Sequence, residues 1–209
     1  MKHRPSDASV TLAMAEGPPD LAALRKLLHV CQLRAKKSLD MRGRDNLLKR
    51  LEAIAKKGRA VGHQGEFWVV GLCDLERDYP CPGALLTRFE PLPQTICLRI
   101  AVRSLEAWLL ADHVGFASHS GVPQRKLPPH PEELDGVKLK LIDLAKTGRF
   151  AGRDLRHHNR QGSDYVRTVT EYIQKQWNPA RAAERSPSLQ RSLSRLRALD
   201  GQIRRPPGR

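Results

Sequence analysis

Three short runs of apolar residues predict strands in the first half of the chain. The runs cover residues 10–15, 65–71 and 95–102. In the last two runs the apolar residues are nearly continuous and do not alternate with polar ones, which is typical of a strand that is covered on both faces. We therefore expect these two segments to lie at the centre of a parallel sheet.

Apolar residues spaced three and four positions apart predict helices between and after these strands. We expect helices at residues 21–33, 46–57, 82–89, 103–112, 134–146, 165–177 and 188–199. Residues 119–131 are rich in proline, glycine and charge, and we interpret them as a loop. Strands that alternate with helices predict βαβ units, and hence an α/β fold with a parallel sheet flanked by helices.

The same pattern divides the chain into an α/β core and a helical extension. We assign residues 1–115 to the core and residues 116–202 to the helical C-terminal extension, and we expect residues 203–209 to form a disordered basic tail. A chain of 209 residues, of which 40% are hydrophobic, is long enough for one such core with an appendage.

The net charge of +15 predicts a polyanionic partner, with nucleic acid as the first candidate and an anionic membrane surface as the second. From Arg25 to Arg59 there are twelve lysines and arginines against three acids. These residues either contact the nucleic-acid backbone or form the solvated basic faces of two amphipathic helices. The residues that we expect to contact nucleic acid are Lys36, Lys37, Arg42, Arg44, Arg156 and His157.

The hydropathy and the cysteines favour a cytoplasmic protein that does not bind membranes. No apolar stretch is long enough to cross a bilayer, and the N-terminus lacks the apolar core of a secretory signal. The four cysteines are scattered without a CxxC pair, which predicts reduced thiols and neither disulfides nor a zinc site.

Three acids follow the predicted central strand at the point where it ends. Asp74, Glu76 and Asp78 occupy alternate positions, so on an extended segment their carboxylates point the same way and can converge on one cation. Ligands of open α/β sheets bind at the carboxyl ends of strands, and carboxylate oxygens suit Mg²⁺ or Mn²⁺. The alternative is a polar loop whose acids are solvated or cap the helix near Cys81.

A second acidic segment, Glu16-Gly17, follows the first predicted strand, so both segments should open onto the same edge of the sheet. Glu16-Gly17 together with Asp74-Leu75-Glu76-Arg77-Asp78 resembles the Toprim domain, which topoisomerases, primases and several defence nucleases share. Glu76 stands where that pattern usually has aspartate. Glutamate still supplies a carboxylate, one methylene further out, which can alter metal affinity or the choice of metal.

Two further segments resemble an uncharacterised bacterial family that is grouped with Toprim folds, domain of unknown function 4276. The first is residues 100–112, and the second joins Trp177-Asn178-Pro179 to residues 185–189. With these segments the resemblance covers most of the chain, and it implies a Toprim-like parallel sheet.

The resemblance implies a nuclease that uses Mg²⁺ (or Mn²⁺) to cleave phosphodiester bonds of nucleic acid, in defence against phage or plasmids. Glu16 would be the catalytic residue that transfers a proton, and Asp74, Glu76 and Asp78 would hold the metal. Related families often act beside a separately encoded ATPase. The alternatives are a non-catalytic basic subunit that binds nucleic acid or such an ATPase, and a nucleotidyl transferase of primase type.

Asp20, Arg103 and Glu106 are additional candidates for the site. Asp20 is also a candidate N-cap of the first helix. Glu106 either faces the site as a further carboxylate or pairs with Arg103 one helical turn earlier, and we favour the pairing.

The C-terminal signature is interpreted as structural. We expect Trp177 to begin a break that lets the last helix pack on the sheet. The leucines of this helix, Leu189, Leu193 and Leu196, are spaced for one apolar face.

Overall fold

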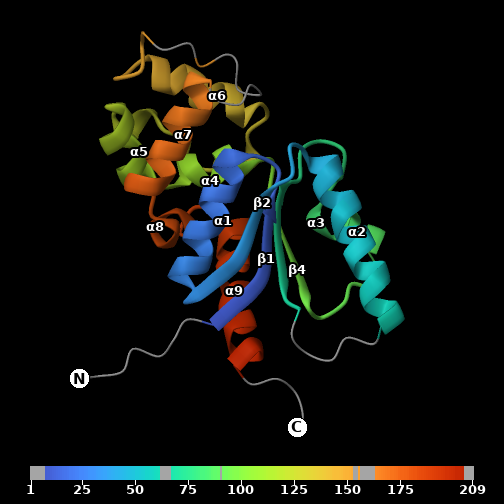
Figure 1. The fold of residues 1–209 in the computed structure, drawn as a ribbon. Coiled ribbons are helices and arrows are strands. Elements are labelled where there is room, and N and C mark those ends of the chain that lie inside the picture. The colour runs from blue at the N-terminus through green and yellow to red at the C-terminus, as the bar shows by residue number, and fades with distance from the viewer. Residues whose placement is uncertain (1–7, 62–66, 90, 153–154, 156–162, 205–209) are drawn as a thin grey trace, which may run out of the picture.

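The protein is an α/β domain built on a four-stranded sheet in which all strands are parallel (Figure 1). The computed structural model describes residues 8–61, 67–89, 91–152, 155 and 163–204. The strands are β1 (Ala8–Ala15), β2 (Leu33–Asp40), β3 (Val69–Asp74) and β4 (Ile96–Ala101), and their order in the sheet is β2-β1-β3-β4. The predicted fold class, a parallel sheet flanked by helices with a helical C-terminal region, is confirmed.

Strands β1 and β3 lie at the centre of the sheet, side by side and in parallel. The expectation that residues 95–102 lie at the centre was wrong, because β4 is an edge strand. Its sequence is nearly all apolar because residues of β4 are buried in the cores on both faces of the sheet. Ala15, the last residue of β1, pairs with Leu72 of β3 on one side and with Asp40 of β2 on the other. Asp74, the last residue of β3, pairs with Ala101 of β4. The carboxyl ends of all four strands therefore meet at one edge of the sheet, where α/β proteins place their ligands.

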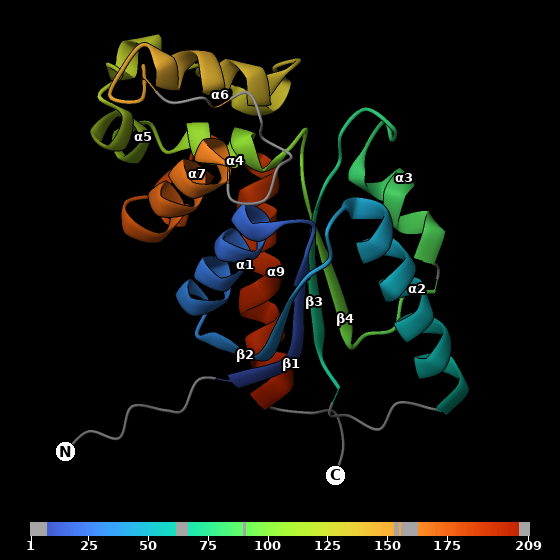
Figure 2. The ribbon, with the colours of Figure 1, turned by 45° about the horizontal axis from the view of Figure 1, so that its top comes forward.

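Helices cover both faces of the sheet (Figure 2). Helices α1 (Pro18–Val30) and α9 (Pro187–Arg204) lie on one face, and α2 (Arg44–Val61) and α3 (Pro82–Leu86) lie on the other. Each face has its own hydrophobic core, so β1 and β3 are buried on both sides and their sequences read as continuous apolar runs.

A β-bulge in β1 changes which core its side chains enter. The carbonyl of Trp68 accepts hydrogen bonds from the backbone N–H groups of both Thr11 and Leu12, at 2.8 and 3.1 Å. Val10 packs in the core under α1, whereas Leu12, two residues later, packs in the core under α2. The extra residue reverses the alternation of the strand, and so sets the face toward which the end of β1 presents its side chains.

The remaining helices gather beyond the carboxyl ends of the strands, on the side of α1 (Figure 1). They are α4 (Leu105–Ala111), α5 (His113–Ser120), α6 (Val137–Lys146), α7 (Asp164–Lys175) and α8 (Pro179–Ala183), with the short 3₁₀ turns η2 (Gln124–Lys126) and η3 (Pro131–Glu133) between them; a further turn, η1 (Thr87–Phe89), continues α3 on the other face. The buried residues of these helices join those of α1 and α9 in one continuous core. No helix in the described part of the chain is long and apolar enough to cross a membrane.

Two elements differ from the sequence-based expectation. The first helix ends at Val30, not at residue 33, and residues 33–40 form the edge strand β2, which was not expected from the sequence. This strand is mostly polar and only partly buried, because it has one neighbour, and so it lacks the apolar run that marks β1 and β3. Helix α5 was not expected either, and its end overlaps the predicted loop at residues 119–120.

The N-cap assignment of Asp20 is also wrong. Gly17 is the N-cap residue of α1, Pro18 opens the helix, and Asp20 lies within its first turn. Proline is tolerated there because the first helical N–H groups have no partner within the helix. Asp20 is therefore the third residue of α1 and lies near the carboxyl edge of the sheet.

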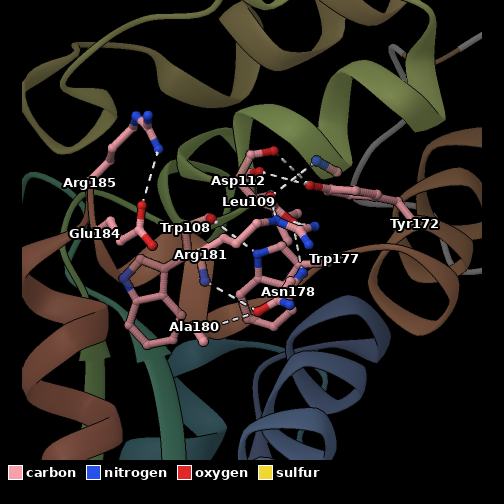
Figure 3. A network of polar contacts seen from close by, with 11 residues as sticks. Trp108, Leu109, Asp112, Tyr172, Trp177, Asn178, Ala180, Arg181, Glu184 and Arg185 are labelled. Carbon is pink, nitrogen blue, oxygen red and sulfur yellow. Dashed lines mark hydrogen bonds and ion pairs between the residues drawn. The ribbon is translucent and has the colours of Figure 1, made fainter.

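The C-terminal helices are tied to α4 by buried polar contacts (Figure 3). Trp177 is 1% exposed, and its indole Nε1 donates to the carbonyl of Trp108 at 3.2 Å. Asp112, which is fully buried, accepts from the guanidinium of Arg181 at 2.8 and 3.0 Å and from the backbone N–H of Asn178 at 2.7 Å. The burial and the hydrogen bond of Trp177 agree with a structural role for this segment.

The start of α9 is held by a second polar cluster. The hydroxyl of Ser188 donates to Glu132 at 2.7 Å and accepts from the indole N–H of Trp108 at 2.7 Å and the backbone N–H of Val102 at 3.2 Å. From there α9 packs against β1 and β4, and its leucines are buried as expected. Ile203 and Arg204 belong to α9, so the helix continues into the segment expected to be a disordered tail. The rest of that tail lies outside the described residues.

Candidate metal centre

Two acids at the ends of neighbouring strands are in direct contact. Glu16 follows β1, and Asp74 is the last residue of β3. The backbone N–H of Asp74 donates to Glu16 Oε1 at 2.8 Å. The side chain of Asp74 in turn accepts through Oδ1 from the backbone N–H of Leu105, at 2.8 Å, which fixes it against the start of α4.

Glu76 completes a group of three carboxylates, which we name the acidic triad: Glu16, Asp74 and Glu76. One carboxylate oxygen from each lies within 4.8 Å of the other two. The chain does not continue as an extended segment after Asp74, because residues 76–78 form a turn. Glu76 has a left-handed backbone (φ 50°), and its N–H donates to the carbonyl of Arg103 at 2.9 Å. The turn, and not strand alternation, brings Glu76 to the triad, so the predicted geometry was wrong.

Asp78 lies away from the triad and pairs with Arg44 at the start of α2. The guanidinium of Arg44 also contacts Glu76 Oε2 at 3.2 Å and the carbonyl of Leu75 at 3.4 Å. Arg44 was expected to contact nucleic acid, but in this structure its charge is directed at the two acids of the turn. Arg44 therefore helps to hold Glu76 in its position within the triad.

The triad opens into a cavity of about 420 Å³ at the carboxyl edge of the sheet. The cavity is lined by the loop after β1, the end of β2, the acidic turn and helices α4, α6 and α7. Six acidic residues line it: Glu16, Asp20, Asp40, Asp74, Glu76 and Glu106. Among the described lining residues Lys138 and Arg42 are the cations.

Glu106 faces the cavity and is 4% exposed. Its Oε1 accepts from the hydroxyl of Tyr165 and contacts Lys138 Nζ at 3.5 Å, and its Oε2 accepts from the hydroxyl of Ser104 at 2.5 Å. The expected pairing with Arg103 is not present among the contacts of the described residues, and the alternative position facing the site is the observed one. Arg103 itself contributes its backbone carbonyl, which accepts from Glu76.

Burial raises the pKa values of three carboxyl groups in this cavity. The pKa of Glu16 rises from 4.5 to about 7, chiefly because of desolvation, which outweighs the hydrogen bond from the Asp74 N–H. The pKa of Asp20 rises from 3.8 to about 8, again through desolvation and then through repulsion by Glu16 and Glu106. Desolvation, followed by repulsion from Asp20, Glu106 and Glu16, raises the pKa of Asp74 well above its ordinary value. In all three groups burial disfavours the ionised form, and the neighbouring acids add to this effect.

Lys138 is the cation that reaches the inner side of the cavity, from α6. Desolvation lowers its pKa, but attraction to Glu106, Asp74 and Asp20 outweighs that effect and raises the pKa above 10.5. Lys138 is therefore protonated at neutral pH, and its charge is directed at those three acids.

Nothing in the sequence pointed to Lys138 and Tyr165 as residues of the cavity wall. Lys138 is one of several lysines in its helix, and Tyr165 is spaced like an ordinary core residue of α7. Neither lies near an acidic segment in the sequence. The topology places both helices beyond the carboxyl ends of β1 and β3, and this placement alone brings their side chains to the acids.

The other residues expected to contact nucleic acid lie around the cavity or outside the described chain. Arg42 lines the cavity mouth and is exposed, and Lys36 and Lys37 are exposed on the edge strand β2, which leads to that mouth. Arg156 and His157 lie outside the described residues.

The chain matched no protein-family model, no curated protein and no solved structure in the comparisons.

The residues of the acidic triad suit a hard divalent cation. Mg²⁺ and Mn²⁺ prefer carboxylate oxygens, and both are small enough for ligands that lie within 4.8 Å of one another. The raised pKa values of Glu16 and Asp74 agree with this assignment, because a cation would favour the ionised forms that desolvation and then repulsion disfavour.

Proposed function

We propose that the protein is a Toprim-like nuclease that cleaves phosphodiester bonds of nucleic acid with Mg²⁺ or Mn²⁺. The observation that carries this proposal is the acidic triad, which joins the ends of two central parallel strands in a cavity at the carboxyl edge of the sheet. Membership of the Toprim-like group, a role in defence and a separately encoded ATPase as partner rest on the resemblance of the sequence motifs.

In this proposal Asp74 and Glu76 hold the metal, with Glu16 beside them. A divalent ion bound there would act as a Lewis acid on a phosphodiester oxygen and lower the pKa of bound water. Asp74 is positioned by the backbone N–H of Leu105, and Glu76 by the guanidinium of Arg44. Asp78 forms an ion pair with Arg44 and so supports the site indirectly; in this proposal it does not bind the metal.

Glu16 is the residue that we assign to proton transfer. Without a metal ion, burial raises its pKa to about 7, and a cation bound beside it would favour the ionised carboxylate, which can accept a proton as a general base. The Asp74 N–H fixes Oε1 of Glu16, so the position of this carboxyl group is set by the backbone of the neighbouring strand.

The exposed basic residues near the cavity favour a polyanionic substrate. Arg42 lies at the mouth of the cavity, in the loop after β2, and Lys36 and Lys37 are exposed on β2, the strand that leads to it. A nucleic-acid backbone bound along β2 would place a phosphate group beside the triad. Attraction by such residues is independent of sequence and concentrates the substrate at the site.

The proposal is tested by incubating the purified protein with plasmid DNA, single-stranded DNA and RNA, each with EDTA, Mg²⁺ or Mn²⁺. We expect cleavage of at least one substrate with a divalent ion and none with EDTA. Binding without cleavage under every condition would contradict the nuclease assignment and favour the non-catalytic basic subunit.

A further inference from the structure

We propose that the ammonium group of Lys138 takes the place of a second divalent cation, so that the cavity binds one metal ion and not two. This inference rests on the proposed function, because it concerns the same cavity. The acids of the cavity form two groups that share Asp74. The outer group is the acidic triad, and the inner group is Asp20, Asp74 and Glu106.

The oxygens of Glu106 already have partners supplied by the protein. Oε1 receives the hydroxyl of Tyr165 and lies 3.5 Å from Lys138 Nζ, and Oε2 receives the hydroxyl of Ser104. A carboxylate oxygen has two lone pairs, so these groups occupy both positions on Oε1. Glu106 is therefore held by fixed donors and would have to lose one of them to bind a metal through Oε1.

The triad differs from the inner group in this respect. Asp74 accepts the Leu105 N–H through Oδ1, and Glu16 accepts the Asp74 N–H through Oε1. The other oxygen of each carboxylate accepts no hydrogen bond from the described residues. Glu16 and Asp74 therefore each have an oxygen to offer to a metal ion, whereas Glu106 already has Lys138 as its cation.

A second metal ion in the inner group would lie close to the ammonium charge. Two-metal sites place their ions about 3.5–4 Å apart, and Mg²⁺ lies about 2.1 Å from its ligand oxygens. An ion bound to Glu106 Oε1 would lie no more than about 6 Å from Nζ, given the 3.5 Å contact and that bond length. Repulsion over this distance inside a largely buried cavity is weakly screened, so Lys138 disfavours the ion.

This role makes the helical extension part of the site. Lys138 lies on α6 and Tyr165 on α7, and both contact Glu106 on α4. Lys138 is then a positioning residue that supplies one fixed positive charge to the inner acids. The metal at the triad supplies the remaining charge.

The test is the number of Mn²⁺ ions bound per chain, measured by calorimetric titration of the full chain and by electron paramagnetic resonance, which detects spin coupling between paired Mn²⁺ ions. We expect one ion and no coupling in the wild type. Lys138→Met keeps the length of the side chain but removes its charge, and should bind two ions with coupling. Lys138→Arg keeps the charge and should bind one, as should the control Lys140→Met, which removes an exposed lysine from the same helix.

The wild-type stoichiometry tests the proposal even if Lys138→Met does not fold. Two coupled ions in the wild type would overturn it, and so would a folded Lys138→Met protein that still binds one ion. If the wild type binds no Mn²⁺, the metal-dependent function itself fails, and this outcome is distinct from an error about Lys138.

Discussion

The backbone N–H of Asp74 donates a 2.8 Å hydrogen bond to Oε1 of Glu16. This bond joins the ends of two neighbouring parallel strands and fixes the carboxyl group of one against the backbone of the other. The two acids are 58 positions apart in the sequence. Their contact depends on the pairing of β1 with β3, so the site is a direct product of the sheet.

Glu16→Gln should remove proton transfer while the protein still folds. The amide oxygen of glutamine can still accept the Asp74 N–H, but glutamine cannot carry a proton. We expect the cleavage rate to fall by about 10²–10⁴-fold, the range of general acid–base contributions. Mn²⁺ binding and the melting temperature should be largely retained. Full cleavage by this variant would exclude Glu16 as the proton-transfer residue.

Removing divalent ions should make the stability of the protein depend on pH. The pKa of Glu16 rises to about 7 and that of Asp20 to about 8, so the folded protein holds these protons more tightly than the unfolded chain does. The resulting stability is fully present below the ordinary values of 4.5 and 3.8 and is lost as the pH rises through 7 and 8. The melting temperature in EDTA should therefore fall over this range.

Mg²⁺ should reverse that loss, because a bound cation stabilises the ionised acids of the folded state. The increase in melting temperature caused by Mg²⁺ should grow as the pH rises from about 5 to about 8. Glu16→Gln serves as the control, since it removes one of the titrating groups and should flatten the curve in EDTA. An Mg²⁺ effect of the same size at every pH would argue against ionised acids as the binding group.

The sequence predicted the central strand β3 and the acids at its end for a clear physical reason. Strand β3 is buried on both faces, so its sequence is an apolar run, and the polar residues that follow mark its end. The edge strand β2 was missed because it is covered incompletely and carries Lys36 and Lys37. Apolar periodicity reports burial and not position in the sheet, so the buried edge strand β4 was predicted but was wrongly placed at the centre.

The inner half of the cavity could not be predicted in the same way. Glu106, Lys138 and Tyr165 meet only because α4, α6 and α7 pack together beyond the sheet. Local spacing favoured a pair between Glu106 and Arg103, whereas the tertiary structure supplies Glu106 with Tyr165 and Lys138. Similarly, alternation along a strand could not show that the chain turns at Glu76.

Trp177→Ala should destabilise the protein without removing a residue from the site. Trp177 is 1% exposed and donates to the Trp108 carbonyl. We expect a loss of about 3–5 kcal/mol in the free energy of unfolding, measured with denaturant, because the substitution leaves a large cavity. Trp177→Phe keeps most of the buried volume and should cost less. Unchanged stability with lost cleavage would instead place Trp177 in the active site.

Binding to nucleic acid should depend steeply on salt. Each phosphate neutralised on duplex DNA contributes about −0.9 to the slope of log affinity against log salt concentration. Replacing the exposed Lys36 and Lys37 by alanine should make this slope less negative by about one to two. A double alanine variant of Lys140 and Lys146 on α6 removes the same charge elsewhere and should leave the slope nearly unchanged. Equal effects of the two double variants would contradict a binding path along β2.

The central claim, that the acidic triad is a centre for divalent-ion-dependent cleavage, is tested most directly by Asp74→Asn. Asparagine keeps the Oδ1 acceptor for the Leu105 N–H but removes the charge that would hold the ion. Cleavage of the best substrate in Mn²⁺ should be measured beside the control Asp143→Asn, in which the replaced acid is exposed on α6. We predict no detectable cleavage by Asp74→Asn and wild-type cleavage by Asp143→Asn, with both variants folded. Wild-type cleavage by Asp74→Asn would contradict the account.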